Sequence, residues 1–376
     1  MKLFDVYPLF PIEPVKAEGS WLWDKEGKKY LDLYGGHAVI SIGHNHPHFV
    51  ERLKNQLDKI SFYSNSVKNP LQEELADKLG KVSGYNDYEL FLCNSGAEAN
   101  ENALKLASFV TGRKKVIAFK KAFHGRTSGA VAATDNPKIV APFNANHEIE
   151  FLPFNDSKVA EERIDSTVAA VIIEGIQGVG GIQVPDNSFL ETLEKKCKQV
   201  GALLILDEVQ SGYGRSGKFF THQHSSIKPD LITTAKGMGN GFPIGSVLIN
   251  PNIKPWSGML GTTFGGNYLS SAAALSVLEV IESENLMANA SSLGNYWMQE
   301  LKSFEAIKEV RGVGLMIGFD LPESLASLRK DLLFKHQIFT GEAKPNTVRL
   351  LPSLALKKSE ADILLEALST ELKQLA

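Results

Sequence analysis

The sequence predicts an α/β fold, in which a mainly parallel central sheet is sandwiched by helices and accompanied by a second, smaller α+β domain. Between about residues 55 and 265, short β-rich runs alternate with helical patterns, as expected for parallel strands joined by crossover helices. The chain has 376 residues, more than one hydrophobic core usually supports. We therefore expect a large domain over residues 46–268 and a small domain that combines residues 1–45 with 285–376.

Each predicted element follows from a change in apolar periodicity. The strands expected in the large domain are Glu89–Cys93, Lys115–Phe119, Ala169–Glu174, Ala202–Asp207, Leu231–Ala235 and Gly245–Ile249. Residues 269–284 contain the pattern AAALSVLEVI, which predicts one long helix connecting the two domains. In the small domain we expect a helix near residues 293–304, β-rich runs at 313–319 and 347–351, and a C-terminal helix from Ser359.

The composition favours a protein that binds small, soluble ligands. The chain has 40 basic and 43 acidic residues. This net charge of −3 gives no excess of positive charge that would attract nucleic acid or an anionic membrane. No window approaches 18 uninterrupted apolar residues, so no membrane span is expected. The two cysteines, Cys93 and Cys197, lie in apolar segments without paired or metal-ligand spacing, which predicts a reduced, cytoplasmic location.

Two of the apolar runs end in one ionisable residue and then break into glycine. Leu203–Gln210 reads LLILDEVQ, and Thr233–Gly239 reads TTAKGMG. Asp207 and Lys236 would thus lie at the carboxyl ends of buried strands, where open α/β sheets keep their chemistry. Partial burial would make Lys236 a candidate Schiff-base amine, and Asp207 could keep a bound pyridine nitrogen protonated. From these two residues alone, a buried ion pair at a domain seam is an equally good interpretation.

A second motif, CNSGAEANE at residues 93–101, favours an anion at a helix N-terminus. Ser95 and Glu98 form a capping-box pattern, and the small residues Gly96 and Ala97 would let a ligand approach the free backbone amides. A phosphate is the natural occupant of such a site. Capping boxes also open many helices that bind nothing, so the motif is weak by itself.

Further motifs offer groups for a planar ring and for carboxylates. Phe123, His124 and Arg126 follow the strand that ends at Phe119; the phenyl ring can stack on a pyridine and the guanidinium can bind a carboxylate bidentately. The loop Gly261–Asn267 presents the hydroxyls of Thr262 and Thr263, and Arg349 could reach a substrate carboxylate at the domain cleft. Each also fits an ordinary loop or surface residue.

Two histidine clusters raise the question of a metal. GHNHPH spans residues 43–48, and HQH spans residues 222–224. Proline interrupts the first cluster, and neither has a carboxylate or thiolate at ligand spacing. We predict hydrogen-bonded loop histidines and no metal.

Taken together, the motifs resemble those of the class III, or subgroup II, pyridoxal-phosphate-dependent aminotransferases, and most of all the acetylornithine aminotransferases. The similarity covers nearly the whole chain. No single motif is specific to this family, but their joint order along the chain is. The matching segments are GHNHP at 43–47, SGAEA at 95–99, FHGR at 123–126, DEVQ at 207–210, AKG at 235–237, GTTF at 261–264 and RLLP at 349–352.

The resemblance implies a PLP-dependent transferase fold of type I and a homodimer whose active sites lie at the subunit interface. It implies pyridoxal 5'-phosphate as cofactor, with Lys236 as the Schiff-base lysine, Asp207 as the partner of the pyridinium nitrogen and Gln210 as the contact to the ring hydroxyl. The remaining cofactor residues it implies are Ser95, Gly96 and Ala97 at the phosphate, Phe123 stacked on the ring with His124 nearby, and Thr263 reaching the partner subunit's cofactor. It assigns Arg126 and Thr262 to the acyl-ornithine and Arg349 to the α-carboxylate of glutamate or 2-oxoglutarate.

The implied activity is ping-pong transfer of a terminal amine to 2-oxoglutarate in arginine biosynthesis. The donor would be N-acetylornithine or another N-acylornithine such as N-succinylornithine. Alternatives are an aminotransferase for ornithine or another ω-amino acid, a PLP-dependent aminomutase, and a phosphate-ligand binding protein that forms no imine. A mutase would turn over without 2-oxoglutarate. The visible spectrum of the purified chain would identify a binding protein that forms no imine.

One position departs from the family pattern. Many relatives read Glu-Pro-Ile/Val-Gln-Gly-Glu where this chain reads EGIQGV at residues 174–179. Val179 therefore replaces a carboxylate that would pair with Arg349 while the amine donor binds. We hypothesise that the donor carries an acyl group with its own acid, such as N-succinylornithine; a catalytic efficiency with N-acetylornithine that equals or exceeds the efficiency with N-succinylornithine would contradict this.

Overall fold

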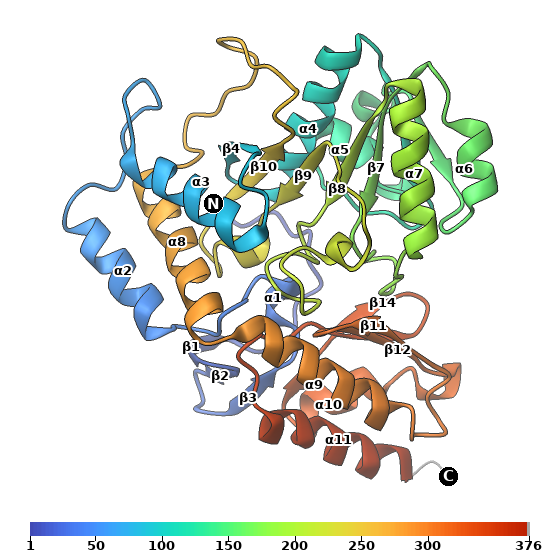
Figure 1. The fold of residues 1–376 in the computed structure, drawn as a ribbon. Coiled ribbons are helices and arrows are strands. Elements are labelled where there is room, and N and C mark those ends of the chain that lie inside the picture. The colour runs from blue at the N-terminus through green and yellow to red at the C-terminus, as the bar shows by residue number, and fades with distance from the viewer. Residues whose placement is uncertain (374–376) are drawn as a thin grey trace.

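A computed structural model describes residues 1–373 of the chain (Figure 1). Its largest element is a seven-stranded sheet in the order β4-β10-β9-β8-β7-β5-β6. The strands are β4 (Glu89–Cys93), β5 (Lys115–Phe119), β6 (Ile149–Leu152), β7 (Val168–Glu174), β8 (Leu203–Asp207), β9 (Leu231–Thr234) and β10 (Gly245–Ile249). The six strands expected from the sequence are all present, within one residue at each end, and β6 is an additional strand at the sheet edge.

The sheet is mainly parallel, as expected, with β10 as its reversed strand. β10 pairs antiparallel with both β4 and β9, whereas the pairs among β5 to β9 are parallel. The register aligns Glu174 on β7 with Asp207 on β8, and Asp207 with Thr233 on β9. The carboxyl ends of three neighbouring strands therefore meet at one edge, and Lys236 follows β9 there.

Helices cover both faces of this sheet (Figure 1). On one face, α4 (Gly96–Thr111) packs against β7, β9 and β10 through small residues such as Ala99 and Ala103. On the other, α7 (Asn187–Val200) buries Phe189, Leu193 and Cys197, whose four-residue spacing places them on one helical stripe. Two shorter helices, α5 (Ser128–Ala132) and α6 (Ser157–Arg163), complete the layers.

A long helix, α8 (Tyr268–Ser283), follows the sheet and matches the expected connecting helix within one residue at each end. It is buried almost all round, and α2 (Pro47–Leu57) and α3 (Pro70–Ser83) pack against it. The helix expected near residues 293–304 begins earlier, because α9 spans Leu286–Leu301 directly after α8. The short element α1 spans Gly35–Ala38.

Two four-stranded sheets lie outside the large sheet, and one of them contains strands from both ends of the chain. One has the order β1-β2-β3-β13 and the other β11-β12-β15-β14. Their strands are β1 (Pro14–Glu18), β2 (Trp21–Asp24), β3 (Lys29–Asp32), β11 (Glu309–Val313), β12 (Met316–Asp320), β13 (Ile338–Phe339), β14 (Gly341–Ala343) and β15 (Thr347–Leu350). Parallel pairing of β13 with β3 joins the N-terminal segment to the C-terminal part, while the domain boundaries themselves stay a prediction.

One expected strand is corrected. The run Val313–Phe319 is divided between β11 and β12, which form an antiparallel hairpin that turns at Gly314 and Leu315. The alternating pattern could not reveal this turn because apolar residues continue through it. Two helices complete this part, α10 (Leu328–Phe334) and α11 (Lys358–Lys373). None of the helices in residues 1–373 combines the length and hydropathy needed to span a bilayer.

Candidate active site

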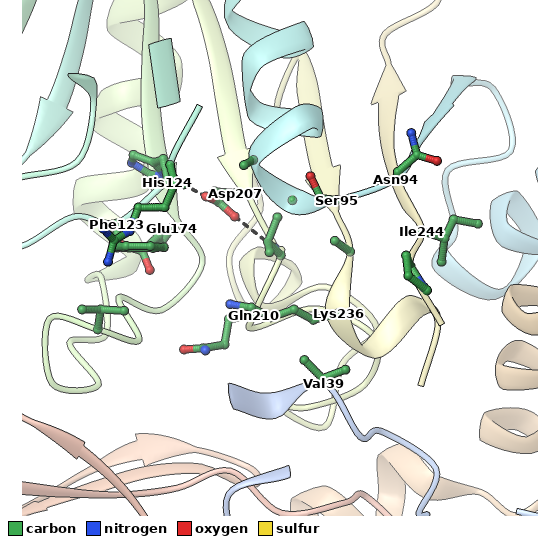
Figure 2. Close-up of a pocket in the computed structure, with 18 of the residues that line it drawn as sticks. Val39, Asn94, Ser95, Phe123, His124, Glu174, Asp207, Gln210, Lys236 and Ile244 are labelled. Carbon is green, nitrogen blue, oxygen red and sulfur yellow. Dashed lines mark hydrogen bonds and ion pairs between the residues drawn. The ribbon is translucent and has the colours of Figure 1, made fainter. Parts of the chain in front are cut away.

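A cavity of about 360 Å³ opens at the carboxyl ends of β7, β8 and β9 (Figure 2). This volume is within the usual range for a small-molecule site. Its polar lining residues are Asn94, Ser95, His124, Arg126, Glu174, Asp207, Gln210 and Lys236. Apolar side chains, among them Val39, Phe123, Val209 and Ile244, complete the wall. Most of the residues that the sequence identified separately therefore line one cavity.

Lys236 lies at the start of a short 3-10 turn, Lys236–Met238, which Ala235 separates from the end of β9. Its φ of +45° is in the left-handed region, which a non-glycine residue adopts at a cost and which recurs at active sites. Burial lowers the pKa of the Lys236 amine to about 8, although Asp207 and Glu174 act in the opposite direction. At slightly alkaline pH the Lys236 amine is therefore uncharged, and nucleophilic, in a substantial fraction of the molecules.

Asp207 is buried at the end of β8, with 4% of its surface exposed. Its Oδ2 accepts hydrogen bonds from Asn100 Nδ2 at 2.7 Å and contacts His124 Nδ1 at 2.7 Å, and its Oδ1 accepts from the Val209 backbone at 3.0 Å. The salt bridges found within residues 1–373 include none between Asp207 and Lys236. The direct ion pair that the sequence left open is therefore not formed in the described structure.

Asn100 is a site residue that sequence analysis missed. It is 1% exposed on the inner face of α4 and donates to both Asp207 Oδ2 and the His124 carbonyl, each at 2.7 Å. Its Oδ1 accepts from Thr233 Oγ1 at 2.6 Å. This one amide connects α4 with β8 and β9. An asparagine on the apolar stripe of a predicted helix was the available signal, because buried polar groups require partners.

Glu174 was also given no role, although it ends β7 as Asp207 ends β8. Its Oε1 accepts from the Phe123 backbone at 3.0 Å and its Oε2 from the Gly178 backbone at 3.1 Å. Burial raises the pKa of the Glu174 carboxyl to about 7, with His124 opposing and Asp207 reinforcing the rise. A third apolar strand that ends in an ionisable residue was the signal in the sequence.

The N-terminus of α4 points its first amides at the cavity. Ser95 Oγ accepts from Glu98 N at 3.1 Å, and the first backbone bond of the helix runs from Ala99 N to Ser95 O. The backbone amides of Gly96 and Ala97 precede that bond and are available to an anion. The expected capping box is only half formed, because Glu98 Oε2 accepts from the Asn94 backbone at 2.8 Å instead of from Ser95.

These residues fit pyridoxal phosphate. Free helix amides suit the phosphate, and a buried carboxylate and the amine of Lys236 face the same cavity. Two buried polar atoms on the wall, Gln210 Oε1 and His124 Nε2, have no hydrogen-bond partner among the described residues, so a polar ligand could satisfy them. Figure 2 shows Gln210 and Lys236 on neighbouring loops below Asp207.

Of the four predicted substrate or partner contacts, Arg126 lines the cavity and the other three lie outside its wall. Arg126 is exposed at the cavity and forms none of the salt bridges found in residues 1–373. Thr262 Oγ1 accepts from Asn94 Nδ2 at 3.2 Å and lines a separate hollow, while Thr263 is exposed on the loop before α8. Neither threonine lines the cavity of its own chain. Arg349, expected at the cleft, is buried on β15 and is absent from the cavity wall.

Four of the five histidines in the two clusters contact acids that are distant in sequence, and the fifth, His224, contacts Ser216. His44 pairs with Asp32 and His46 with Glu284, each at 2.8 Å. The buried His222 contacts Glu208 at 2.8 Å. Within residues 1–373, no group of three or more histidine, cysteine, aspartate and glutamate side chains is arranged to hold a metal ion. Both cysteines are free and buried.

Comparisons with known proteins agree with this geometry. Residues 5–372 match the family model "Aminotransferase class-III". The chain is 43% identical to the acetylornithine aminotransferase of Archaeoglobus fulgidus, over 92% of each chain, and 41% identical to the [LysW]-aminoadipate semialdehyde/glutamate semialdehyde transaminase of Sulfolobus acidocaldarius, over 94% of this chain and 92% of that one. An ornithine aminotransferase structure from Toxoplasma gondii, described with partial occupancy of PLP at its active site, superposes with a TM-score of 0.90 at 28% identity, over 98% of this chain and 91% of that one. The chain therefore belongs to the class III aminotransferases and is a pyridoxal-phosphate-dependent transaminase of fold type I.

Proposed function

We propose that this chain transfers the terminal amine of an N-acylornithine to 2-oxoglutarate in arginine biosynthesis. The relative from Archaeoglobus fulgidus, which carries the name acetylornithine aminotransferase and matches over 92% of both chains, supports N-acetylornithine as the donor. One structural observation carries the chemistry. Lys236 is held in a strained backbone conformation at a cavity whose wall also contains the buried carboxylate of Asp207.

We assign the cofactor contacts from this wall. The amides of Gly96 and Ala97, with Ser95 beside them, hold the phosphate, and Phe123 covers the ring near His124. Gln210 offers its free Oε1 to the ring hydroxyl. These roles follow from the motif resemblance, and the positions of the residues around one cavity support them.

The bound cofactor supplies an aldehyde that exchanges amines and a ring that accepts electrons from the substrate carbon. Lys236 supplies the amine that holds the cofactor and then the base that moves a proton at the reacting carbon, since its pKa of about 8 allows Nζ to accept and return a proton near neutral pH. Asp207 is the carboxylate that would pair with the ring nitrogen. The hydrogen bonds from Asn100 and Val209, with the contact to His124, fix this carboxylate in place.

For the substrates, we assign Arg126 and Thr262 to the acyl-ornithine and Arg349 to the α-carboxylate of glutamate or 2-oxoglutarate. Arg126 supports this assignment because it is an exposed guanidinium at the cavity without a salt-bridge partner among residues 1–373. N-succinylornithine is the second candidate donor. Val179 lines the cavity and is 47% exposed. Because this side chain is neutral, it would not repel an acidic acyl group as a glutamate at the same position would.

We further propose a homodimer in which Thr263 contacts the partner subunit's cofactor. Thr263 is exposed, and beside it Phe264, which is 59% exposed, contacts the partly exposed Phe62 with ring centroids 5.4 Å apart. Exposed aromatic side chains of this kind favour a protein interface. A cytoplasmic location, inferred from the buried free cysteines, is part of the same proposal.

A steady-state panel tests the function. Ornithine, N-acetylornithine, N-succinylornithine and 4-aminobutyrate are each offered as donor, with 2-oxoglutarate as acceptor. We expect the highest kcat/KM with an N-acylornithine and formation of glutamate in equal amount. Preference for ornithine or 4-aminobutyrate would contradict the proposal in favour of another ω-amino-acid aminotransferase.

An omission experiment addresses the aminomutase alternative. If product forms at an undiminished rate when 2-oxoglutarate is withheld, the chain moves the amine within one molecule and the proposal is wrong. An acyl-lysine donor belongs in the panel as well, because the relative from Sulfolobus acidocaldarius is named for an aminoadipate semialdehyde substrate.

A further inference from the structure

Arg349 is a buried cation for which the described structure provides no anion. It is 4% exposed, and burial lowers its pKa. Its Nε donates to the Glu342 carbonyl at 2.8 Å, but the carboxylate of Glu342 is bound by Arg329. The NH1 atom is buried without a partner among the described residues. A buried guanidinium left in this way is costly unless another group compensates its charge.

The compensating group is an aromatic ring. The guanidinium carbon of Arg349 lies 5.9 Å from the centroid of the Tyr34 ring, within the range of a cation–π interaction. The ring rests directly on Gly341, the residue that pairs with Arg349 across β14 and β15. A Cβ at Gly341 would lie 2.4 and 2.6 Å from two ring carbons, so only glycine leaves room for the ring there. Tyr34 and Gly341 therefore form one packing unit over Arg349.

A strained turn holds this ring in position. Residues 35–38, which form α1, all have φ between +56° and +68°, so this single turn is left-handed, and His37 and Ala38 adopt that conformation as non-glycine residues. A Cβ on Gly35 would lie 2.8 Å from the Leu351 carbonyl, so the turn is pressed against the end of β15. The Tyr34 hydroxyl contacts His37 Nδ1, which fixes the ring from its outer end.

The same turn is connected to the cofactor cavity. Gln210 Nε2 donates to the His37 carbonyl at 3.1 Å. The Tyr34 ring is only partly buried and His37 is exposed, whereas the arginine behind them is buried. Tyr34 thus contacts Arg349 through its ring, and the turn that follows Tyr34 contacts Gln210 of the cavity wall, whereas Arg349 itself lines no part of that wall.

We propose that Tyr34 is a specificity-determining residue that covers Arg349. Its ring shields the guanidinium while the amine-bearing end of the donor, which carries no carboxylate, occupies the site, and a dicarboxylic acceptor must displace the ring to reach the arginine. His37 positions the ring. This inference rests on the assignment of Arg349 to the acceptor under the proposed function. Under this inference the neutral Tyr34 shields Arg349, because position 179 is a valine and provides no acid to pair with the arginine.

The test measures binding of glutarate, an unreactive dicarboxylate, to the purified holoenzyme by calorimetry. Tyr34→Leu removes the ring, and Gly341→Ala forces it away from Arg349 while keeping the tyrosine. Both variants are expected to bind glutarate about tenfold more tightly, within the range of a partly desolvated cation–π contact. Tyr34→Phe keeps the ring but loses the contact to His37, so its gain is expected to be smaller.

Kinetics provide a second measurement. In Tyr34→Leu, KM for 2-oxoglutarate should fall while KM for the amine donor rises, because the uncovered charge now faces the donor's methylene groups. A general loss of stability would change both in the same direction. Tyr296→Leu is the matched control, since that ring lies 4.1 Å from Lys358 Nζ in another part of the chain and should leave glutarate binding unchanged.

Unchanged glutarate affinity in both Tyr34→Leu and Gly341→Ala would overturn the proposal. Weaker affinity would also overturn it, because Tyr34 would then be a ligand of the carboxylate and not a cover. Arg349→Leu separates this inference from its premise. If Arg349→Leu still binds glutarate as the wild type does, the assignment of Arg349 to the acceptor fails; if it loses binding while the Tyr34 and Gly341 variants equal the wild type, the cover alone fails.

Discussion

Replacing Asn100 by alanine should weaken cofactor binding and destabilise the chain, although Asn100 lies outside the cavity wall. Its side chain makes three buried hydrogen bonds, to Asp207, to the His124 carbonyl and with Thr233, all between 2.6 and 2.7 Å. Alanine leaves Thr233 and the His124 carbonyl without this partner and removes one of the donors that fix Asp207. The variant therefore perturbs the geometry of the carboxylate that we assign to the ring nitrogen.

The size of the effect follows from the kinds of bonds lost. A hydrogen bond to a buried carboxylate contributes about 1.5–3 kcal/mol, and each of the two neutral bonds about 1 kcal/mol. We expect a loss of about 4 kcal/mol in the free energy of unfolding of the cofactor-free chain. If the lost bond to Asp207 reduces the free energy of cofactor binding by about 1.4 kcal/mol, the Kd of the cofactor rises about tenfold.

The assay is titration of the cofactor-free protein with pyridoxal phosphate, followed by absorbance, together with denaturant unfolding. Asn102→Ala is the matched control, because Asn102 is on the same helix but, within residues 1–373, its side chain donates only to the Glu98 carbonyl, at 2.8 Å. Asn102→Ala should bind the cofactor with wild-type affinity. If Asn100→Ala also binds it with wild-type affinity, then the network does not hold Asp207 in its functional position and the reasoning is refuted.

Three further predictions address the cavity. Lys236→Ala should abolish transamination, and hydride reduction of the wild-type holoenzyme should attach the cofactor to the peptide that contains Lys236; mass spectrometry that finds the label on another residue would disprove the assignment. Glu174→Gln should remove a pH dependence of stability: the pKa of this carboxyl rises from 4.5 to about 7 on folding, so the folded state binds the additional proton between these values and the wild type loses about 3 kcal/mol as pH rises through them. Parallel pH–stability curves for the two cofactor-free proteins between pH 4.5 and 7 would contradict this. Arg126→Leu should raise KM for an N-acylornithine at least about tenfold, as expected for loss of a charged hydrogen-bond pair, and leave the cofactor Kd unchanged; an unchanged KM in steady-state assays would exclude Arg126 from the substrate site.

Local pattern was sufficient to predict six of the seven strands of the large sheet. Buried parallel strands read as continuous apolar runs, and a charged residue that follows such a run can lie only at its end, which gave the placement of Asp207 and Lys236. The small sheets were harder to predict. Strands β13 and β14 are two and three residues long, and β13 pairs with β3 across about three hundred residues of sequence, so their pairing leaves no periodic signal.

The sequence by itself determined the class of fold, the family motifs and the residues to which we assign the chemistry, since each is encoded by neighbours within a few positions. Only the tertiary structure decided how those residues are supported. Asn100 meets Asp207 across 107 residues, and the Tyr34 ring meets Arg349 because β14 leaves a glycine beneath it. Such contacts depend on how separate elements pack, and a buried polar group finds its partner wherever the packing brings one, so no spacing along the chain can reveal it.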